Sequence, residues 1–407
     1  MDVLHQRCAG LDVHKEVIYV CVLIGSSRNG DRHTFKCGTF HHDLLELRAK
    51  LLEFGVTHVM MESTGVYWMP IYDVLEGHVE IVVANAQHIM NVPGRKTDEK
   101  DAEWLAKLLR FGLVNPSFVP PREIRELRQL TRYERSLVQA HASEQNRVEK
   151  HLQVSGIKLT SVASKVFTVS GEHMIEAIAE GVTNPAELAD LALGKMRKKI
   201  PQLQAAFAGT ISEHTQQILA LHSEHLKRLD CTLAETELKI AEKVKSYQPH
   251  IELLDTCPGI NRRTAIAVLA ETGPDMSPWE NSRKFAAMGG LCPGNYISAG
   301  KRLKNRSRRG NPYLKSTMVQ AACSAINTNG SYYQAKYFHL KKRIGHKRAI
   351  VAIAHAMLVA IYHMLKTGQP HRDLGAAHVT DTAKNHKKQH AVKLLQSLGY
   401  SVAITPV

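Results

Sequence analysis

The chain has 407 residues, enough for two or three domains, and its composition of 44% hydrophobic and 22% charged residues excludes a disordered chain. The formal net charge of +15 favours a polyanionic partner. All of the excess lies in residues 281–372, which contain 17 Lys and Arg but no Asp or Glu; the other 36 basic residues are balanced by 38 acidic ones. An acid-free segment of this length predicts nucleic-acid binding.

Two features of the sequence bear on compartment. Seven cysteines without a CxxC pair argue against a disulfide framework and against a cysteine-based zinc site. The start of the chain lacks a secretory signal pattern, and the apolar run 349–365 is short for a membrane span and contains two histidines. We therefore expect a buried helix there, a cytoplasmic protein and no membrane association.

The first 115 residues alternate strand and helix signals. The pattern predicts strands in "CAGLDVHKEVIYVCVLI" (a hairpin), "RHTFKCGTF", "VTHVMMEST" and "VEIVVANA", and helices in "LLELRAKLLEFG" and "YWMPIYDVLEG". A further amphipathic helix follows in "DEKDAEWLAKLLRFG", with Thr97 as its expected N-cap. These elements predict an α/β sheet domain with a hairpin at its edge.

The character changes after residue 120. One long helix is predicted over about 122–153 and a second over about 214–247, each with apolar residues at near-heptad spacing. The pattern alone leaves two interpretations open: an antiparallel coiled-coil arm that carries a helical insert, or an internal helical bundle.

The third region begins at "LLDTCPGINRRTAIAVLAETG". A Pro-Gly turn between two helices, followed by Arg262 and Arg263, resembles a helix-hairpin-helix, whose turn can hold a DNA phosphate. The same dipeptide also makes ordinary helix–helix turns. After residue 368 the sequence is polar, with one weak helix expected at "AVKLLQSLGY".

Four acids in the first domain have unusual positions. Asp12 lies in an apolar strand, Glu62 ends another strand, and Asp98 and Asp101 are three residues apart at the start of a helix. If the first and fourth strands are neighbours, Asp12 and Glu62 lie side by side, and a shared cation would offset the repulsion between the carboxylates. Plainer alternatives remain: Asp12 ends its strand, Glu62 caps the next helix, and the helix acids complement the helix dipole.

The blocks "GLDVHKE", "MESTGVYW" and "GRKTDEKDAEWLA" resemble those of the DEDD transposases, the bridge-RNA-guided recombinases of the "one-ten" insertion-sequence family. The resemblance continues at "PGINRRTAIAVLAETG", "KFAAMGGLCPGNYISAGK" and "SRRGNPYLKS". The helical insert and the tail "LLQSLGYSVAITPV" are similar to its "eleven-eleven" subgroup. The resemblance implies a RuvC-like domain of the ribonuclease H class, a coiled-coil arm and a helical transposase domain.

The resemblance also implies roles for residues. Asp12, Glu62, Asp98 and Asp101 would hold Mg²⁺, and Ser298 would attack a DNA phosphate to form a covalent 5′-phosphoserine link. The implied partners are donor and target DNA, a structured non-coding guide (bridge) RNA, and further copies of the chain in a tetramer, a dimer of dimers. In such an assembly the acids of one protomer would work with the serine of another.

Apart from the resemblance, only the surroundings of Ser298 support its role as a nucleophile. Mg²⁺ could activate the hydroxyl of Ser298, which lies in a Gly-rich loop within the acid-free segment. By itself a serine in such a loop is an ordinary turn residue, and Ser282, Ser307 and Ser316 are competitors. The residues expected to contact nucleic acid are Arg262, Arg263, Lys301, Arg302, Lys304, Arg306, Arg308 and Arg309.

The expected domains are 1–118 (RuvC-like), 119–248 (arm with insert), 249–372 (basic transposase domain) and 373–407 (tail). The leading interpretation is an RNA-guided DNA transposase or recombinase. The alternatives are a DNA invertase of the same family, a junction nuclease that uses water without a covalent step, and an RNA-binding scaffold in which the acids are structural.

Overall fold

The computed structural model of the chain describes residues 2–27, 30–63, 65–85, 98–293, 296–298, 301–304, 307 and 310–403. Within these ranges, the side chains of residues 98–99, 296–298, 301–304, 382–387 and 390 are outside the description. The chain separates once into compact units, Met1–Val119 and Pro120–Val407. The further boundaries expected at 248 and 372 fall inside the second unit.

The first unit is a mixed α/β domain. Its elements are β1 (Arg7–Val13), β2 (Ile18–Ile24), β3 (Asp31–Cys37), α1 (His41–Glu53), β4 (His58–Glu62), α2 (Trp68–Leu75), β5 (Glu80–Ala84) and α4 (Asp98–Arg110). The five strands form one sheet in the order β3-β2-β1-β4-β5. The pairs β1–β2 and β2–β3 are antiparallel, whereas β4 is parallel to both β1 and β5. The first and fourth strands are neighbours, which is the condition on which the pairing of Asp12 with Glu62 depended.

Side chains of each strand alternate between two cores, one on each face of the sheet. Leu11 and Met61 lie in the core that α1 and α2 cover, whereas Cys8 and Met60 lie in the core that α4 covers. Since the direction alternates, Asp12 and Glu62 belong to the face that α4 covers.

The second unit is mostly helical. Its elements are α5 (Arg122–Val154), α6 (Leu159–Val162), α7 (Val169–Ala179), α8 (Pro185–Asp190), η1 (Gly194–Lys199), α9 (Ile200–Ala206), α10 (Glu213–Lys243), η2 (Lys245–Tyr247), α11 (Gln248–Asp255), α12 (Arg262–Thr272), α13 (Ser282–Met288), β6 (Tyr296–Ser298), β7 (Lys301–Lys304), α14 (Pro312–Ala325), α15 (Tyr332–Ile344), α16 (His346–Thr367) and α17 (Gly375–Ser397). β6 and β7 form an antiparallel hairpin.

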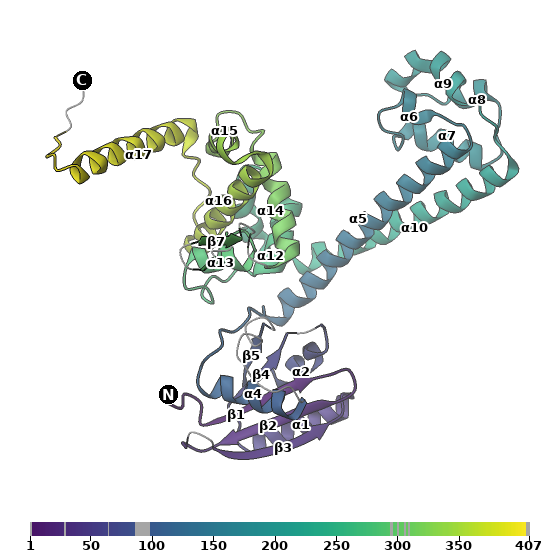
Figure 1. Cartoon of the computed structure of the whole chain (residues 1–407). Helices are drawn as coiled ribbons and strands as arrows, with labels where there is room; N and C mark the ends of the chain where they lie inside the picture. Colours follow the sequence, from purple (N-terminus) through teal and green to yellow (C-terminus); the bar gives the residue numbers. More distant parts are fainter. Residues whose placement is uncertain are drawn as a thin grey trace. The chain divides into compact units, whose positions relative to one another are not determined.

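Helices α5 and α10 form an antiparallel arm, which Figure 1 shows side by side. The Nζ of Lys243 contacts Glu126 at one end, and the hydroxyls of Ser155 and Thr215 are 3.0 Å apart at the other. One hydrophobic core closes each end: α6 to α9 pack on the distal end, and α11 to α16 pack at the base. The arm interpretation therefore holds for the two long helices.

Helix α16 is long and apolar enough to cross a membrane by length and composition alone, but half of its most apolar stretch is buried inside the protein. Ile353, Met357 and Ile361 of this helix are fully buried in the core at the base of the arm. The expectation of a buried helix is confirmed here. Helix α17, by contrast, begins at Gly375 and is much longer than the weak helix expected at 391–400.

Candidate functional site

Asp12 and Glu62 come together because their strands are parallel neighbours. The last registered pair of β1 and β4 is Leu11 with Met61, and Asp12 and Glu62 are the next residue of each strand. Both side chains are half-buried. The helix-cap alternative for Glu62 is excluded, because α2 begins six residues later with Tyr67 as its N-cap and without a side-chain cap bond.

Helix α4 crosses the same face and runs against the direction of β1. The Sγ of Cys8 donates a hydrogen bond to the carbonyl oxygen of Ala106, whereas Gly10 faces Ala102. Advancing along β1 towards Asp12 therefore moves back along α4 towards its first turn. Asp98 and Asp101 lie in that first turn, and so at the Asp12 end of the sheet.

Gly10 is what lets the helix approach so closely. A Cβ atom at this position would lie 2.2 Å from the carbonyl oxygen of Ala102 and 2.4 Å from the amide nitrogen of Ala106. Both contacts are with helix backbone, which cannot move aside alone. Arg32 of β3 forms an ion pair at 2.8 Å with Glu103 of α4. The hydrogen bond from Lys107 and the ion pair with Arg32 lower the pKa of the Glu103 carboxyl.

Three further polar side chains lie beside Asp12 on the same face of the sheet. His14 Nε2 donates to Asp12 Oδ2 at 3.1 Å, and its ring meets the ring of Tyr19 edge-on. Tyr19 pairs with Asp12 across β1 and β2, and Lys36 of β3 lies with its Nζ 4.7 Å from the Tyr19 ring centroid. Sequence reasoning missed Tyr19 and Lys36, although strand alternation places both on the face of Asp12.

The donor set at this edge suits a divalent cation. Carboxylate oxygens are the ligands that Mg²⁺ prefers, and the ends of β1 and β4 and the first turn of α4 carry carboxylates at the same edge of the sheet. The described side chains contain no group of three or more His, Cys, Asp or Glu arranged around one ion. The side chain of Asp98 is outside the description, so the fit rests on Asp12, Glu62 and the placement of Asp101.

Ser298 belongs to the second unit, at the end of β6 where its backbone pairs with Lys301 of β7. Arg302 and Lys304 continue β7. The side chains of these four residues, and the whole of Arg306, Arg308 and Arg309, lie outside the described residues, as does Thr97.

The two ends of the segment that carries this hairpin are held together. Pro293 and Ser307 form a bridge, and the amide of Asn311 donates to the carbonyl of Met288 at 2.8 Å. A Cβ at Gly310 would lie 2.3 Å from the amide nitrogen of Gly290, so the two chain segments touch through backbone.

Two of the competing serines have structural partners. The Nζ of Lys315 donates to Ser307 Oγ at 2.7 Å, beside the bridge to Pro293. Ser316 Oγ accepts from Arg135 and donates to the carbonyl of Tyr313. Both hydroxyls thus contribute to packing around the hairpin and the arm.

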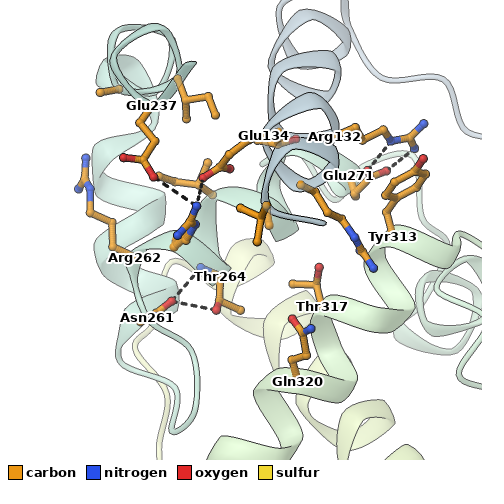
Figure 2. Close-up of a pocket in the computed structure, with 18 of the residues that line it drawn as sticks. Arg132, Glu134, Glu237, Asn261, Arg262, Thr264, Glu271, Tyr313, Thr317 and Gln320 are labelled. Atoms are coloured by element: carbon orange, nitrogen blue, oxygen red, sulfur yellow. Dashed lines mark hydrogen bonds and ion pairs between the residues drawn. The ribbon is translucent and has the colours of Figure 1, made fainter. Parts of the chain in front are cut away.

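Arg262 and Arg263 line a pocket of about 780 Å³ at the base of the arm (Figure 2). Asn261 caps α12 by accepting from the amide of Thr264 at 2.9 Å, which defines the turn of the expected helix-hairpin-helix. Arg263 contacts Glu134 of α5 and Glu237 of α10. It therefore ties α12 to the arm, whereas the guanidinium of Arg262 contacts only Gln248 among the described residues.

The opposite wall of this pocket contains a buried acid that the sequence did not reveal. Glu271 is almost fully buried and accepts two hydrogen bonds of 2.8 Å from Arg132 (Figure 2). It also accepts from Asn311, the N-cap of α14. Arg132 lies 4.1 Å above the ring of Tyr313. The base of the arm is thereby joined to the end of the hairpin segment.

Comparisons with known proteins identify two family matches along the chain. Residues 9–156 match the DEDD transposase family of IS110, and residues 251–338 match the family described as "Transposase IS116/IS110/IS902 family". The four acids lie in the first matched segment and Ser298 lies in the second. Together the two segments cover more than half of the chain, and both define a transposase, an enzyme that acts on DNA.

Three similar proteins are also named transposases. A probable family 20 transposase of Pseudomonas aeruginosa is 25% identical over 85% of this chain and 92% of its own length. The transposase for insertion sequence element IS1533 of Leptospira borgpetersenii is 24% identical over 89% and 96%. A putative transposase of Sinorhizobium fredii is 27% identical over 40% of this chain and 43% of its own length. The chain belongs to the IS110 family of transposases.

Proposed function

We propose that this transposase cleaves and rejoins DNA strands with two sets of residues: the acids of the first unit and Ser298 of the second. The observation that carries the proposal is the register of β1 and β4, which makes Asp12 and Glu62 neighbours on the face that α4 covers. Two adjacent carboxylates repel each other unless a cation lies between them. Their placement therefore supports a shared cation site at this edge of the sheet.

We infer that Asp12, Glu62, Asp98 and Asp101 hold Mg²⁺. When bound, the ion would supply positive charge that favours an ionised hydroxyl and offsets the charge of a phosphate. The strand order and the two antiparallel pairs support a RuvC-like domain of the ribonuclease H class.

We infer that Ser298 Oγ attacks the phosphorus of a DNA strand. The bond from phosphorus to the 3′ oxygen breaks, that oxygen takes up a proton, and a 5′-phosphoserine remains. Attack by another 3′ hydroxyl on this ester would rejoin a strand and release the serine, so the phosphodiester is conserved. The position of Ser298 in an acid-free segment supports this role, because carboxylates there would repel the phosphate.

We further infer the partners of the reaction. The basic segment suits donor and target DNA together with a structured guide (bridge) RNA, and the resemblance to the insertion-sequence family favours a tetramer, a dimer of dimers. In such an assembly Ser298 of one protomer would meet the acids of another. We expect the protein to act in the cytoplasm. A DNA invertase remains the second candidate, and short element ends beside the gene would separate it from a mobile element.

The decisive experiment compares serine variants on a labelled DNA substrate with the guide RNA. Ser298→Ala should keep DNA and RNA binding but lose strand cleavage by more than about a thousandfold, together with the covalent protein–DNA species. Ser282→Ala is the matched control and should keep both strand cleavage and the covalent protein–DNA species. Ser307→Ala tests the hydroxyl that contacts Lys315.

Asp12→Ala should also abolish cleavage, through loss of a metal ligand. Mixing Asp12→Ala with Ser298→Ala protomers should restore part of the cleavage if the site forms between protomers. Normal cleavage by Ser298→Ala would replace the serine mechanism with a nuclease that uses water. Loss of the covalent species in Ser307→Ala alone would move the nucleophile to that residue. Absence of any metal-dependent cleavage would favour the RNA-binding scaffold.

A further inference from the structure

A second pocket lies in the C-terminal half of the second unit, with a volume of about 490 Å³. The first turn of α15, one face of α16 and the segment 367–374 enclose it. We propose that this pocket binds a single unpaired nucleobase, with the adjoining phosphate at its cationic rim. The inference rests on the proposed function in one respect: the ligand is part of a nucleic acid that the enzyme already holds.

The shape and polarity of the pocket fit a flat heterocycle. Ala356, Val359 and Ala360 occupy one face of α16 and make an apolar floor. Because two of these side chains are methyl groups, the floor leaves room for a ring. The polar lining includes Tyr332, Lys336, His355, His363, His371 and Arg372. An apolar floor with polar groups at the edge is the usual form of a small-ligand site.

The charge of the lining distinguishes this pocket from the larger one at the base of the arm. There, Glu134, Glu237 and Glu271 line the wall and contact its arginines. The described residues that line the second pocket contain no carboxylate. All of them except Leu374 belong to the acid-free segment, so the side chains that line the pocket bring positive charge to the rim. The nearby carboxylate of Asp373 accepts hydrogen bonds from the amides of Tyr332 and Gly375.

His355 has hydrogen-bonding capacity to spare. Its imidazole is half-buried on α16, and burial, together with the charge of Lys336, lowers its pKa. The neutral ring then offers one donor and one acceptor. It makes no hydrogen bond with any residue the structure describes, so both groups remain available for the edge of a base.

The remaining polar residues are held in place by the protein. The Nζ of Lys336 donates to the Tyr332 hydroxyl at 2.9 Å, which fixes the ring at the rim. The hydroxyl of Tyr333 and His371 Nε2 are 3.0 Å apart, and the amide of His371 donates to Thr256 Oγ1 at 2.9 Å. The segment over the pocket is thus anchored, and a ligand would enter a preformed site.

Binding should be measured with full-length protein and a duplex that carries one bulged base, against the same duplex with an abasic bulge. The same comparison with two RNA hairpins, one with a bulged base and one with an abasic bulge, shows whether the base comes from RNA or from DNA. Stacking and edge contacts should make the base-containing ligand tighter by about five- to 150-fold. A 2-aminopurine placed in the bulge should lose fluorescence on binding, as a stacked base does.

His355→Ala and His363→Ala should bring the ratio of the two affinities close to one; His363 is exposed, so its variant keeps the fold. His339→Ala, from the exposed side of α15, is the matched control and should keep the ratio. Equal binding of base and abasic ligands by the wild type, in both DNA and RNA, would overturn the proposal. So would pocket variants that retain the ratio.

This readout does not depend on strand cleavage. If Ser298→Ala still cuts DNA while the base preference is present, the serine mechanism fails and the pocket stands. If the base preference is absent while the serine results hold, the pocket alone fails.

Discussion

Glu144 shows how one residue can set a property of the arm. Its carboxylate is almost fully buried between α5 and α10, where it accepts from His222 Nδ1 at 2.5 Å and from Arg147 at 2.6 Å. His225 lies 3.3 Å away. Against the cost of burial, the hydrogen bonds from His222, Arg147 and His225 lower the pKa of Glu144 to about 2. The carboxylate therefore remains ionised inside the seam.

This pKa predicts a stability change in acid. In an unfolded chain the carboxyl titrates near its ordinary value of 4.5, so its contribution is complete above that pH and is lost as the pH falls towards 2. Glu144→Gln should lower the free energy of unfolding at pH 7 by about 1–3 kcal/mol, because the donors lose a charged acceptor. Denaturant unfolding between pH 7 and pH 3 measures both effects.

The variant should also show a weaker dependence on pH than the wild type below pH 4.5. Glu149→Gln on the same helix is the matched control, since Glu149 has no ion pair among the described residues, and it should behave as the wild type. A wild type and a Glu144→Gln variant whose stabilities fall in parallel would contradict the assignment of the low pKa to Glu144.

At the scale of elements, the contact between β1 and α4 is what positions the acids. Gly10→Ala should push α4 away from the sheet, because its new Cβ meets helix backbone at 2.2 Å. We expect a loss of about 1–3 kcal/mol in stability and faster amide hydrogen exchange across residues 98–110. Strand cleavage should fall as well, since Asp98 and Asp101 lie in that helix.

Gly77→Ala provides the control for the change of residue type. Gly77 has a φ of 80° but open space around its would-be Cβ, so the substitution strains only the local turn. Amide exchange in α4 should then be unchanged. If Gly10→Ala leaves exchange in α4 and strand cleavage unaltered, the close approach does not control the placement of the acids.

Local patterns predicted most elements well and a few poorly. Short apolar runs bounded by turn residues mark strands that are buried on both faces, so the strands of the sheet could be predicted from such runs, whereas the face of Asp12 and Glu62 became clear only from the two cores. The two long helices followed from near-heptad spacing. The buried contacts of Glu144 and Glu271 did not, because a polar residue in an apolar seam looks like a solvent-facing one until its partners from distant helices are known.

For the molecule as a whole, the segregation of charge predicts how it holds nucleic acid. If residues 281–372 contact phosphates, the logarithm of affinity should fall with the logarithm of salt concentration, with a slope of roughly −0.9 per phosphate on duplex DNA. Arg308→Ala combined with Arg309→Ala should remove about two phosphate contacts and make the slope less steep by the corresponding amount. Fluorescence anisotropy between 50 and 300 mM salt measures it.

A control with equal charge loss separates contact from net charge. Lys195→Ala with Lys198→Ala removes two exposed lysines of η1, at the distal end of the arm, and should leave the slope unchanged. An unchanged slope in the Arg308 and Arg309 variant would remove that pair from the interface. A wild type whose binding is insensitive to salt would remove the whole segment.

The proposed division of the chemistry between the two units rests on resemblance alone. Composition located the basic segment, and a charge within an apolar strand or at the end of one drew attention to Asp12 and Glu62. Nothing in the local sequence around Ser298 separates it from Ser282 or Ser307, because a nucleophile is defined by what approaches it from elsewhere. Short helices α6 to α9 likewise follow from packing on the arm and not from any periodicity of their own.

The antiparallel course of α5 and α10 also has a consequence for how such a chain can vary. The chain leaves the base of the arm along α5 and returns to it along α10, so the segment from α5 to α10 begins and ends at the base. Removing seven residues from each helix would shorten a strut of about 50 Å by about 10 Å and keep the seam in phase. The length of the arm can therefore change in steps of seven residues per helix, in evolution or by design, while the cores at its two ends stay as they are.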